Sequence, residues 1–332
     1  MKTYIGIELR DCAMKIAVCS GETIKSFKVV QLPTHLIIND TVSYWDEMAA
    51  YIKQIVKDLG IGCKNVALVL PESIAYTRRF TLPYMTISQL MFNLPYEFHD
   101  FIGAEKNEYI YDYALMDIAE EEDNGQMVKK MDIMAAAISK QMLEQYSNMF
   151  KKAGLRLKIA APESSAYQNL IRKHMEQVPD ETVKDYAILH LGHSAVSLRI
   201  FTDGKYETGK EMGFGLNQAL AHFPTSLNPD YVLTEDMEQT TGSIVDSEEM
   251  LSLYNQIALE VMRVVNFFVY NYPDNTLEAL HCCGIGTHIE PLMDLLRETL
   301  HLKVKPLDDL FPMIQDKEAL TLGAAAIGIV WS

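Results

Sequence analysis

The chain contains the same supersecondary pattern twice, and this repeat constrains its fold more than any other feature. One copy begins at Tyr4 and the other at Tyr186. Each copy has a short apolar strand, a polar turn, a second apolar strand that ends in a glycine-containing turn, and a third, more polar strand. The glycine-containing turns are Ser20-Gly21 and Asp203-Gly204. Two such three-stranded units, one in each half of the chain, predict two related α/β domains.

The overall charge of the chain limits its partners. The chain has 332 residues, a length typical of two domains, and a net charge of −16 at pH 7. A field of this sign repels phosphate backbones, so the composition argues against a nucleic-acid partner. A single nucleotide is still compatible with it, because backbone N–H groups and a metal ion can hold phosphates locally.

The cysteine content and the termini favour a cytoplasmic protein. Five cysteines, an odd number without paired spacing, favour a reducing compartment over a disulfide framework, and no cysteine–histidine cluster has zinc spacing. The N-terminal residues lack the apolar segment of a signal peptide. The longest apolar stretch, residues 324–331, is too short to cross a bilayer. We therefore expect no membrane span, and any association with a membrane would come through a partner.

Between the two repeats, the pattern predicts a crossover and an insertion. A helical pattern at residues 42–60 is followed by an apolar strand at 65–71, which gives the first sheet a parallel part. In the insertion, Thr86 and Gln89 match a capping box, and Pro95 should kink or split the helix that follows. The acidic residues 120–125 are expected to form a solvated loop between two strands.

The order of these elements predicts the domain organisation. We expect one domain from residues 1–82 and 159–185, an inserted subdomain from 83–158, and a second domain from 186–317. The small, apolar residues of the last segment, 318–332, predict a buried helix that returns to the first domain.

Several segments, taken in order, resemble one family. They are residues 5–18, 66–85, 108–116, 153–171, 190–220, 257–273, 280–296 and 319–328. Their sequence and spacing are similar to those of PilM, an actin-like cytoplasmic protein of type IV pilus and related competence or secretion systems that is itself similar to FtsA. The resemblance implies an α/β, actin-like (ribonuclease H-like) two-domain fold in which the insertion is subdomain 1C. It also implies a cleft for ATP and Mg²⁺.

The first phosphate-binding loop of the family contains Asp-x-Gly-Ser followed by a lysine. By resemblance, Glu8 occupies the place of the aspartate, Arg10 that of the glycine and Asp11 that of the serine, whereas Lys15 matches. Glycine at this turn lets backbone N–H groups approach the phosphates without an intervening Cβ. Arg10 removes that access, and Asp11 adds a negative charge beside the expected phosphate.

The second loop also departs from the family pattern, which is Asp-Ile-Gly. Here it is His190-Leu191-Gly192, with Ser194 following. The aspartate helps to place Mg²⁺ or its water shell, and an imidazole cannot take that role. The other positions that the resemblance assigns to the nucleotide are Gly213, Gly215, Glu260, Arg263, Gly284 and Gly286.

Two hypotheses follow for the cleft. Glu8, Arg10 and His190 should face one another, and they could form an internal polar cluster that fills the space of the metal and the phosphates. Alternatively, Arg10 could supply positive charge directly to a phosphate. In both cases no metal ligand and no catalytic residue is assigned.

The resemblance implies a scaffold at the inner face of the cell membrane. It would bind the cytoplasmic tail of a bitopic, PilN-like protein in a groove built from the strand after Pro71 and the helix 86–101. It would connect that protein to the assembly ATPase and the platform protein, with weak or no ATPase activity of its own. The alternative is a functional actin-like ATPase that cycles or polymerises.

Two further classes fit less well. A small-molecule kinase is disfavoured because His190 replaces the metal-side carboxylate and no candidate base follows in the expected loop. A division role like that of FtsA is disfavoured because the chain stops at Trp331-Ser332, without an amphipathic membrane-binding helix.

Overall fold

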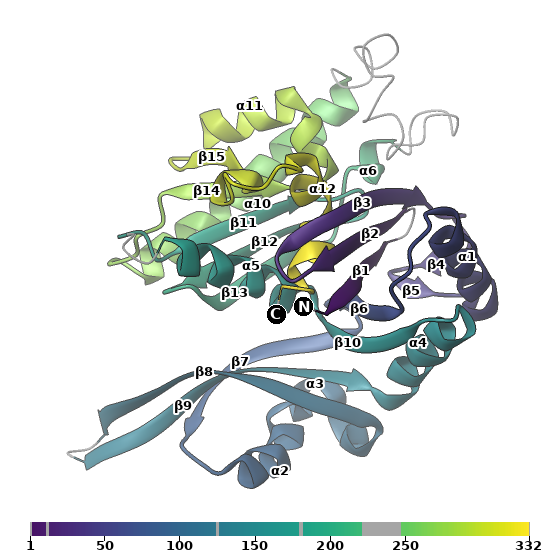
Figure 1. The fold of residues 1–332 in the computed structure, drawn as a ribbon. Coiled ribbons are helices and arrows are strands. Elements are labelled where there is room, and N and C mark those ends of the chain that lie inside the picture. The colour runs from purple at the N-terminus through teal and green to yellow at the C-terminus, as the bar shows by residue number, and fades with distance from the viewer. Residues whose placement is uncertain (1, 11–12, 124–125, 179–181, 221–246, 332) are drawn as a thin grey trace.

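The computed structural model of the chain describes residues 2–10, 13–123, 126–178, 182–220 and 247–331. In these residues the chain forms two five-stranded sheets and one three-stranded sheet (Figure 1). A two-stranded ribbon, β4 (Ile37–Ile38) with β5 (Thr41–Val42), accompanies them. None of the described helices is both long and apolar enough to cross a bilayer.

The N-terminal sheet is built by the first repeat and the crossover that follows it. Its strand order is β10-β6-β1-β2-β3. Strands β1, β2 and β3 pair antiparallel with one another. Strand β6 pairs parallel with β1, and β10 pairs parallel with β6. The elements are β1 (Thr3–Arg10), β2 (Ala13–Ser20), β3 (Thr23–Gln31), α1 (Trp45–Asp58), β6 (Asn65–Leu70), β10 (Arg156–Pro162) and α5 (Glu163–Gln177). The predicted crossover and parallel part are therefore confirmed.

The C-terminal sheet repeats this topology. Its strand order is β13-β12-β11-β14-β15, again with three antiparallel strands followed by two parallel ones. The strands are β11 (Tyr186–Leu191), β12 (Val196–Thr202), β13 (Lys205–Met212), β14 (Ala279–Cys283) and β15 (Lys303–Pro306). The helical elements of this half are α6 (Asn217–Leu220), α10 (Glu248–Asn271), η2 (Ile285–His288), α11 (Glu290–Thr299) and η3 (Leu307–Leu310). Both halves thus fold alike, as the sequence repeat predicts.

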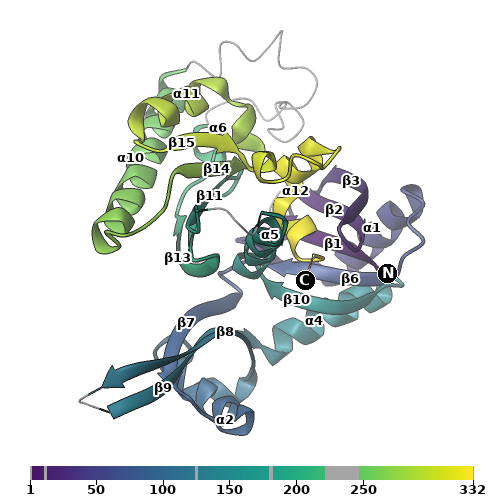
Figure 2. The ribbon, with the colours of Figure 1, turned by 60° about the vertical axis from the view of Figure 1, so that its left-hand side comes forward.

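One helix, α12 (Lys317–Gly328), joins the two halves. Figures 1 and 2 show it between the N-terminal sheet and the elements of the C-terminal half. Its alanines share one buried core with residues of both sheets, such as Ala17 and Ile188. Small side chains let the helix approach closely: a Cβ on Gly6 of β1 would lie 1.8 Å from the carbonyl oxygen of Ala326. Helix α12 thus packs against β1 of the first sheet.

The small sheet lies beside the two large ones and has the order β7-β9-β8 (Figure 2). Its strands are β7 (Ala75–Pro83), β8 (Tyr109–Asp123) and β9 (Gln126–Ser139). One face is covered by α2 (Ile87–Glu97), α3 (His99–Ile102) and η1 (Gly103–Glu108). Leu90 and Leu94 of α2, and Phe98 between α2 and α3, share a core with Ile133 and Ala135 of β9. Helix α4 (Lys140–Lys152) then leads back to β10.

The local signals at α2 agree with the structure. The Thr86 hydroxyl accepts a hydrogen bond from the Gln89 backbone N–H, and the Gln89 side chain accepts one from the Thr86 N–H, so the predicted capping box is confirmed. Helix α2 continues past Pro95 and ends at Glu97, and α3 follows. The expected break therefore occurs two residues after the proline.

One expectation about the insertion is wrong. The acidic stretch is not a loop, because β8 continues to Asp123 and β9 begins at Gln126; residues 124 and 125 lie outside the described part. The physical reason is charge complementarity across the strands. Glu120 lies opposite Lys129, and Lys130 bonds to Glu121 at 2.7 Å.

The close contact between β1 and α12 gives a stability prediction. Gly6→Ala would push a Cβ against a backbone carbonyl, which can move only with its helix. We expect the free energy of unfolding to fall by about 2 kcal/mol or more. The control is Gly62→Ala, where a Cβ meets nothing within 4 Å. Chemical denaturation measures both variants, and equal stability of the two would contradict the prediction.

Candidate functional site

A buried carboxylate lies at the centre of the contact between the two halves. Glu163 is the first residue of α5 and is fully buried. Its Oε2 accepts hydrogen bonds from Arg10 at the end of β1 and from Arg199 on β12, the latter at 3.0 Å. One carboxylate of the N-terminal half thus pairs with arginines from both sheets. Its place in the first turn of a helix also favours a negative charge.

A second carboxylate, Glu8, completes the N-terminal side of the cluster. Its Oε1 lies 3.2 Å from Lys15 Nζ and 3.5 Å from Arg10 Nε. Glu8 and Lys15 are direct partners in the β1–β2 ladder, so the antiparallel register itself brings these charges together. Asp40 adds a third carboxylate at 3.5 Å from Arg10 Nη1.

His190 closes the cluster from the C-terminal sheet. It lies near the end of β11, is 6% exposed, and places Nδ1 3.5 Å from Glu163 Oε1. Burial lowers the pKa of His190 to about 4, and the nearby Lys15 ammonium acts in the same direction. The imidazole is therefore neutral at pH 7.

The arginines keep Glu163 ionised. Burial by itself would raise the pKa of Glu163, but the charges of Arg199 and Arg10 outweigh it and hold the pKa well below its usual range. Burial would likewise raise the pKa of Glu8, which Lys15 and Arg10 bring below its ordinary value. The cluster therefore holds opposite charges that neutralise one another without an added ion.

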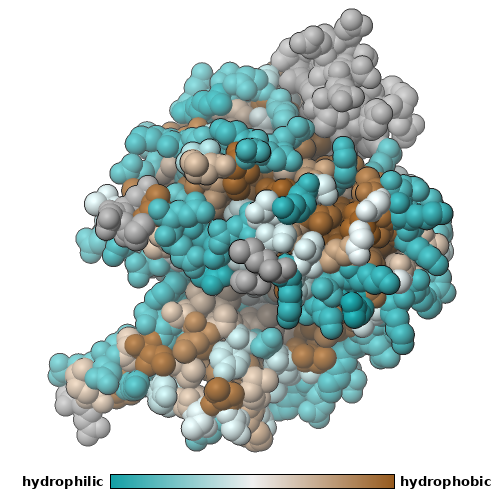
Figure 3. All heavy atoms as spheres, in the orientation of Figure 1, coloured by the Kyte–Doolittle hydropathy of each residue, from teal (hydrophilic) through white to brown (hydrophobic). Residues whose placement is uncertain are grey.

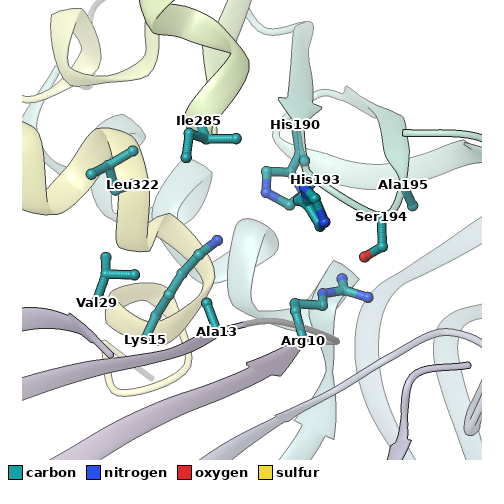
Figure 4. A pocket seen from close by; sticks show the side chains of 11 residues that line it. Arg10, Ala13, Lys15, Val29, His190, His193, Ser194, Ala195, Ile285 and Leu322 are labelled. Atoms are coloured by element: carbon teal, nitrogen blue, oxygen red, sulfur yellow. The ribbon is translucent and has the colours of Figure 1, made fainter. Parts of the chain in front are cut away.

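A small cavity remains beside the cluster. Figure 4 shows Arg10 and Lys15 extending from the N-terminal sheet toward His190 and His193. The cavity has a volume of about 50 Å³, enough for a few water molecules. Gly284, at φ +88°, packs against His190, and a Cβ there would lie 2.7 Å from the His190 ring.

The structure brings together only part of the predicted nucleotide positions. Arg10, Lys15, His190, Gly192 and Ser194 line the cavity, and Glu8 lies behind Lys15. The other glycines, namely Gly213, Gly215, Gly284 and Gly286, lie around the turns of the C-terminal half, and Asp11 lies outside the described residues.

Two predicted positions lie apart from the cavity. Glu260 and Arg263 pair with each other on α10, and Glu260 also accepts a hydrogen bond from Lys210 of β13 at 2.8 Å. These two predicted positions are thus engaged with one another and with β13 rather than with the lining of the cavity.

Two central residues are missing from the sequence prediction. Glu163 directly follows a proline at the junction of a strand and a helix, and Arg199 interrupts the apolar strand β12. A charge inside an apolar strand is a signal for a buried partner, because an unpaired buried charge is costly. The sequence held this signal for Arg199, but it did not indicate that the partner would come from the other half.

Removing the central charge should destabilise the fold. Glu163→Gln leaves Arg10 and Arg199 without their shared counter-charge, and we expect a loss of about 3 kcal/mol or more of unfolding free energy. The matched control is Glu290→Gln, which removes a surface ion pair with Arg297 and should cost less than about 1 kcal/mol. Urea denaturation at pH 7 compares them, and a loss no greater than that of the control would contradict the central role of Glu163.

The buried histidine should make stability depend on pH. Between pH 6.5 and about 4, His190 binds a proton in the unfolded chain but not in the folded one. Since the unfolded state then binds more protons, stability falls as the pH falls through this window. In His190→Gln the loss of unfolding free energy from pH 7 to pH 5 should be smaller. Burial, Lys15 and Arg10 keep the imidazole neutral, whereas the carboxylates Glu163 and Glu8 oppose them. An equal loss in both proteins would show that this balance does not hold His190 neutral.

Comparisons with known proteins agree with this architecture. The PilM-PilN type IV pilus biogenesis complex is similar with a TM-score of 0.79, at 19% identity, covering 98% of this chain and 97% of that chain. The ethanolamine utilization protein EutJ from Carboxydothermus hydrogenoformans has a TM-score of 0.57 at 12% identity, with 100% and 90% covered. MreB 5 of Spiroplasma citri bound to AMPPNP has a TM-score of 0.53 at 10% identity, with 99% and 95% covered. The comparison with curated proteins gives no match.

These likenesses concern the fold, because all three identities are low. They confirm the actin-like, two-domain α/β fold with its inserted subdomain that the sequence predicts. The family itself is shown by sequence: the family model described as type IV pilus assembly protein PilM matches residues 6–321, nearly the whole chain. The chain therefore belongs to the PilM family of type IV pilus assembly proteins.

Proposed function

We propose that this protein is a cytoplasmic scaffold of a type IV pilus or a related competence or secretion assembly, and that its own side chains replace a nucleotide in the cleft. The observation that carries the proposal is the shared buried carboxylate: Glu163 binds Arg10 and Arg199 where a metal and phosphates would need space. The cavity of about 50 Å³ is small beside the roughly 300 Å³ or more of ordinary ligand pockets.

The charges in the cleft also fit MgATP poorly. Lys15 and Arg10 neutralise the charge of Glu8 through Oε1, so its carboxylate attracts a hydrated cation less strongly. His190 is neutral and buried in the place of the family's aspartate. We therefore propose no catalytic step at this site. The first domain (residues 1–82 and 159–185), the inserted subdomain (83–158) and the second domain (186–317) would act as three parts of a binding protein.

A second hollow offers a better place for a partner. It lies between β10 of the N-terminal sheet and the small sheet, and its volume is about 560 Å³. Ala75, Ala136 and Ile138 line it from the small sheet, whereas Ile159 and Ala160 line it from β10. The lining is mostly apolar, and the charged side chains among the lining residues are Asp112 and Lys158. We call this hollow the partner groove.

The partner groove suits an extended peptide. Strand β10 is the last strand of its sheet, so one of its edges is not used by a neighbouring strand of that sheet. A strand edge next to apolar pockets is a common site for a peptide that binds in extended form. The apolar side chains Ile159, Ala160 and Ala161 are only half-buried there, so a peptide could bury them further.

The sequence analysis expects a groove built from the strand after Pro71 and the helix 86–101, and Ala75 of that strand lines the hollow. Helix α2 does not contribute to the lining, because Leu90 and Leu94 pack on the opposite face of the small sheet. Strands β7, β8, β9 and β10 and the helix α4 provide most of the lining. Side chains alternate between the two faces of a strand, so one sheet serves α2 on one side and the groove on the other.

The occupant that we propose is the cytoplasmic N-terminal tail of a bitopic, PilN-like membrane protein. The support is family membership together with the similarity to a PilM that was solved in complex with PilN. Such a tail would hold the protein at the inner face of the cell membrane. Contacts with the assembly ATPase and the platform protein belong to the same proposal.

Titration calorimetry with MgATP tests the cleft. We expect no heat of binding at millimolar nucleotide, because the phosphate space is occupied by paired side chains. Micromolar binding or measurable hydrolysis would overturn the degenerate cleft and favour the alternative, a functional actin-like ATPase.

A pair of neighbouring residues on α4 tests the partner groove. Ser147 lines it, whereas the next residue, Asn148, lines a hollow on the side of α1; both are exposed. Ser147→Trp should block the groove and weaken binding of the tail peptide about tenfold or more, which corresponds to about 1.4 kcal/mol. Asn148→Trp should bind like the wild type. Fluorescence anisotropy with a labelled tail peptide measures both, and equal affinities would place the peptide elsewhere.

A further inference from the structure

We propose that Arg79 and Glu207 form a clamp that sets the opening of the partner groove by fixing the small sheet to the C-terminal half. The inference rests on the proposed function, since it concerns the same groove. It assigns a positioning role to two residues that lie outside both the cleft and the groove.

The clamp joins the small sheet to the C-terminal sheet. Arg79 on β7 donates from Nε to Asp132 on β9 at 2.9 Å, and its Nη1 reaches Glu207 on β13. The other oxygen of Glu207 accepts a hydrogen bond from the Tyr272 hydroxyl at 2.6 Å. A second bridge, from Lys205 to Asp117 of β8 at 2.6 Å, lies beside it. The guanidinium thus connects two sheets that share no strand.

The partners of Arg79 are well held on both sides. The start of β13 is fixed to helix α5, because Gln168 donates to the Gly204 carbonyl at 2.6 Å and accepts from the Tyr206 N–H. Arg79, Asp132 and Glu207 are each a quarter exposed or less, so water screens their charges only in part. A partly sheltered, multiply bonded arginine fixes geometry better than an exposed ion pair does.

The clamp and the groove lie on the same face of the small sheet. Arg79 pairs with Met134 in the β7–β9 ladder, and Ala75 pairs with Ile138. Residues 75 and 79 of one strand point to the same face and are about 13 Å apart along it. The small sheet is continuous between Ala75 and Arg79. A shift of β13 would therefore tilt the small sheet relative to β10. The groove wall formed by Ala75 and Ile138 would move with it.

The charges therefore act at a distance from the peptide. Neither Arg79 nor Glu207 is among the residues that line the groove, so a change in tail affinity on their substitution reports position rather than lost contact. The direction of the effect follows from the sign of the new charge: Glu207→Gln removes an attraction, and Glu207→Lys replaces it with a repulsion against Arg79.

Three variants test the clamp in the full chain, with the labelled tail peptide as probe. We expect Glu207→Lys to weaken tail binding about fivefold or more, and Glu207→Gln to weaken it less. The double variant Arg79→Met with Glu207→Lys offers the introduced lysine to Asp132 and should recover affinity. The control Glu290→Lys disrupts a surface pair with Arg297 and should leave tail affinity unchanged.

A distance measurement separates the clamp from the proposed function. Spin labels are attached to genetically encoded non-canonical amino acids at the exposed positions Ser88 and Glu298, so that the native cysteines stay unlabelled. They report the distance between α2 and α11. Glu207→Lys should broaden or shift this distance, and the double variant should restore it. A wild-type distance together with wild-type tail affinity in Glu207→Lys would overturn the inference. If the wild type itself fails to bind the tail, the proposed function fails, whereas the label distance still decides whether the clamp positions the small sheet.

Discussion

The structure depends on one buried carboxylate that neutralises arginines from two sheets. Breaking such a pair costs several kcal/mol, because the partner charges would stay in a low-dielectric interior without compensation. Glu163 therefore fixes how the C-terminal sheet sits on the N-terminal one. In a fold whose halves close on a nucleotide, the ligand supplies such contacts. Here the chain supplies them from its own side chains.

The replacement of a nucleotide by side chains that we propose would change what the fold can be used for. A cleft that is closed by internal ion pairs keeps its halves in one relation without a ligand. The partner groove and the clamp at Arg79 are both built on that relation, since β13 is bonded to α5 and to the small sheet. A fixed groove can bind an extended peptide at a lower entropic cost than a mobile one. With the function that we propose, the fold would serve as a rigid connector rather than as the catalyst of a chemical cycle.

Much of the architecture is predictable from local patterns. The strand repeats, the crossover, the capping box at Thr86 and the helix α12 all appear as expected, because each depends on residues close in sequence. The acidic stretch 120–125 departs from the prediction for the opposite reason. Its charges suggest a solvated loop until Lys129 and Lys130 are placed across from them, and that placement depends on the register of the hairpin.

The sequence alone determined the repeat of the three-stranded unit and the crossover of the first half, since periodicity and turn signals act over a few residues. The departures at Glu8, Arg10 and His190 follow from the resemblance to the PilM family. Only the tertiary structure decided which charges neutralise one another. Glu163 and Arg199 are far apart in the chain, and the sequence around either residue does not indicate that the two pair. Long-range pairing of charges depends on how whole sheets pack, and packing is a property of the assembled core rather than of any segment.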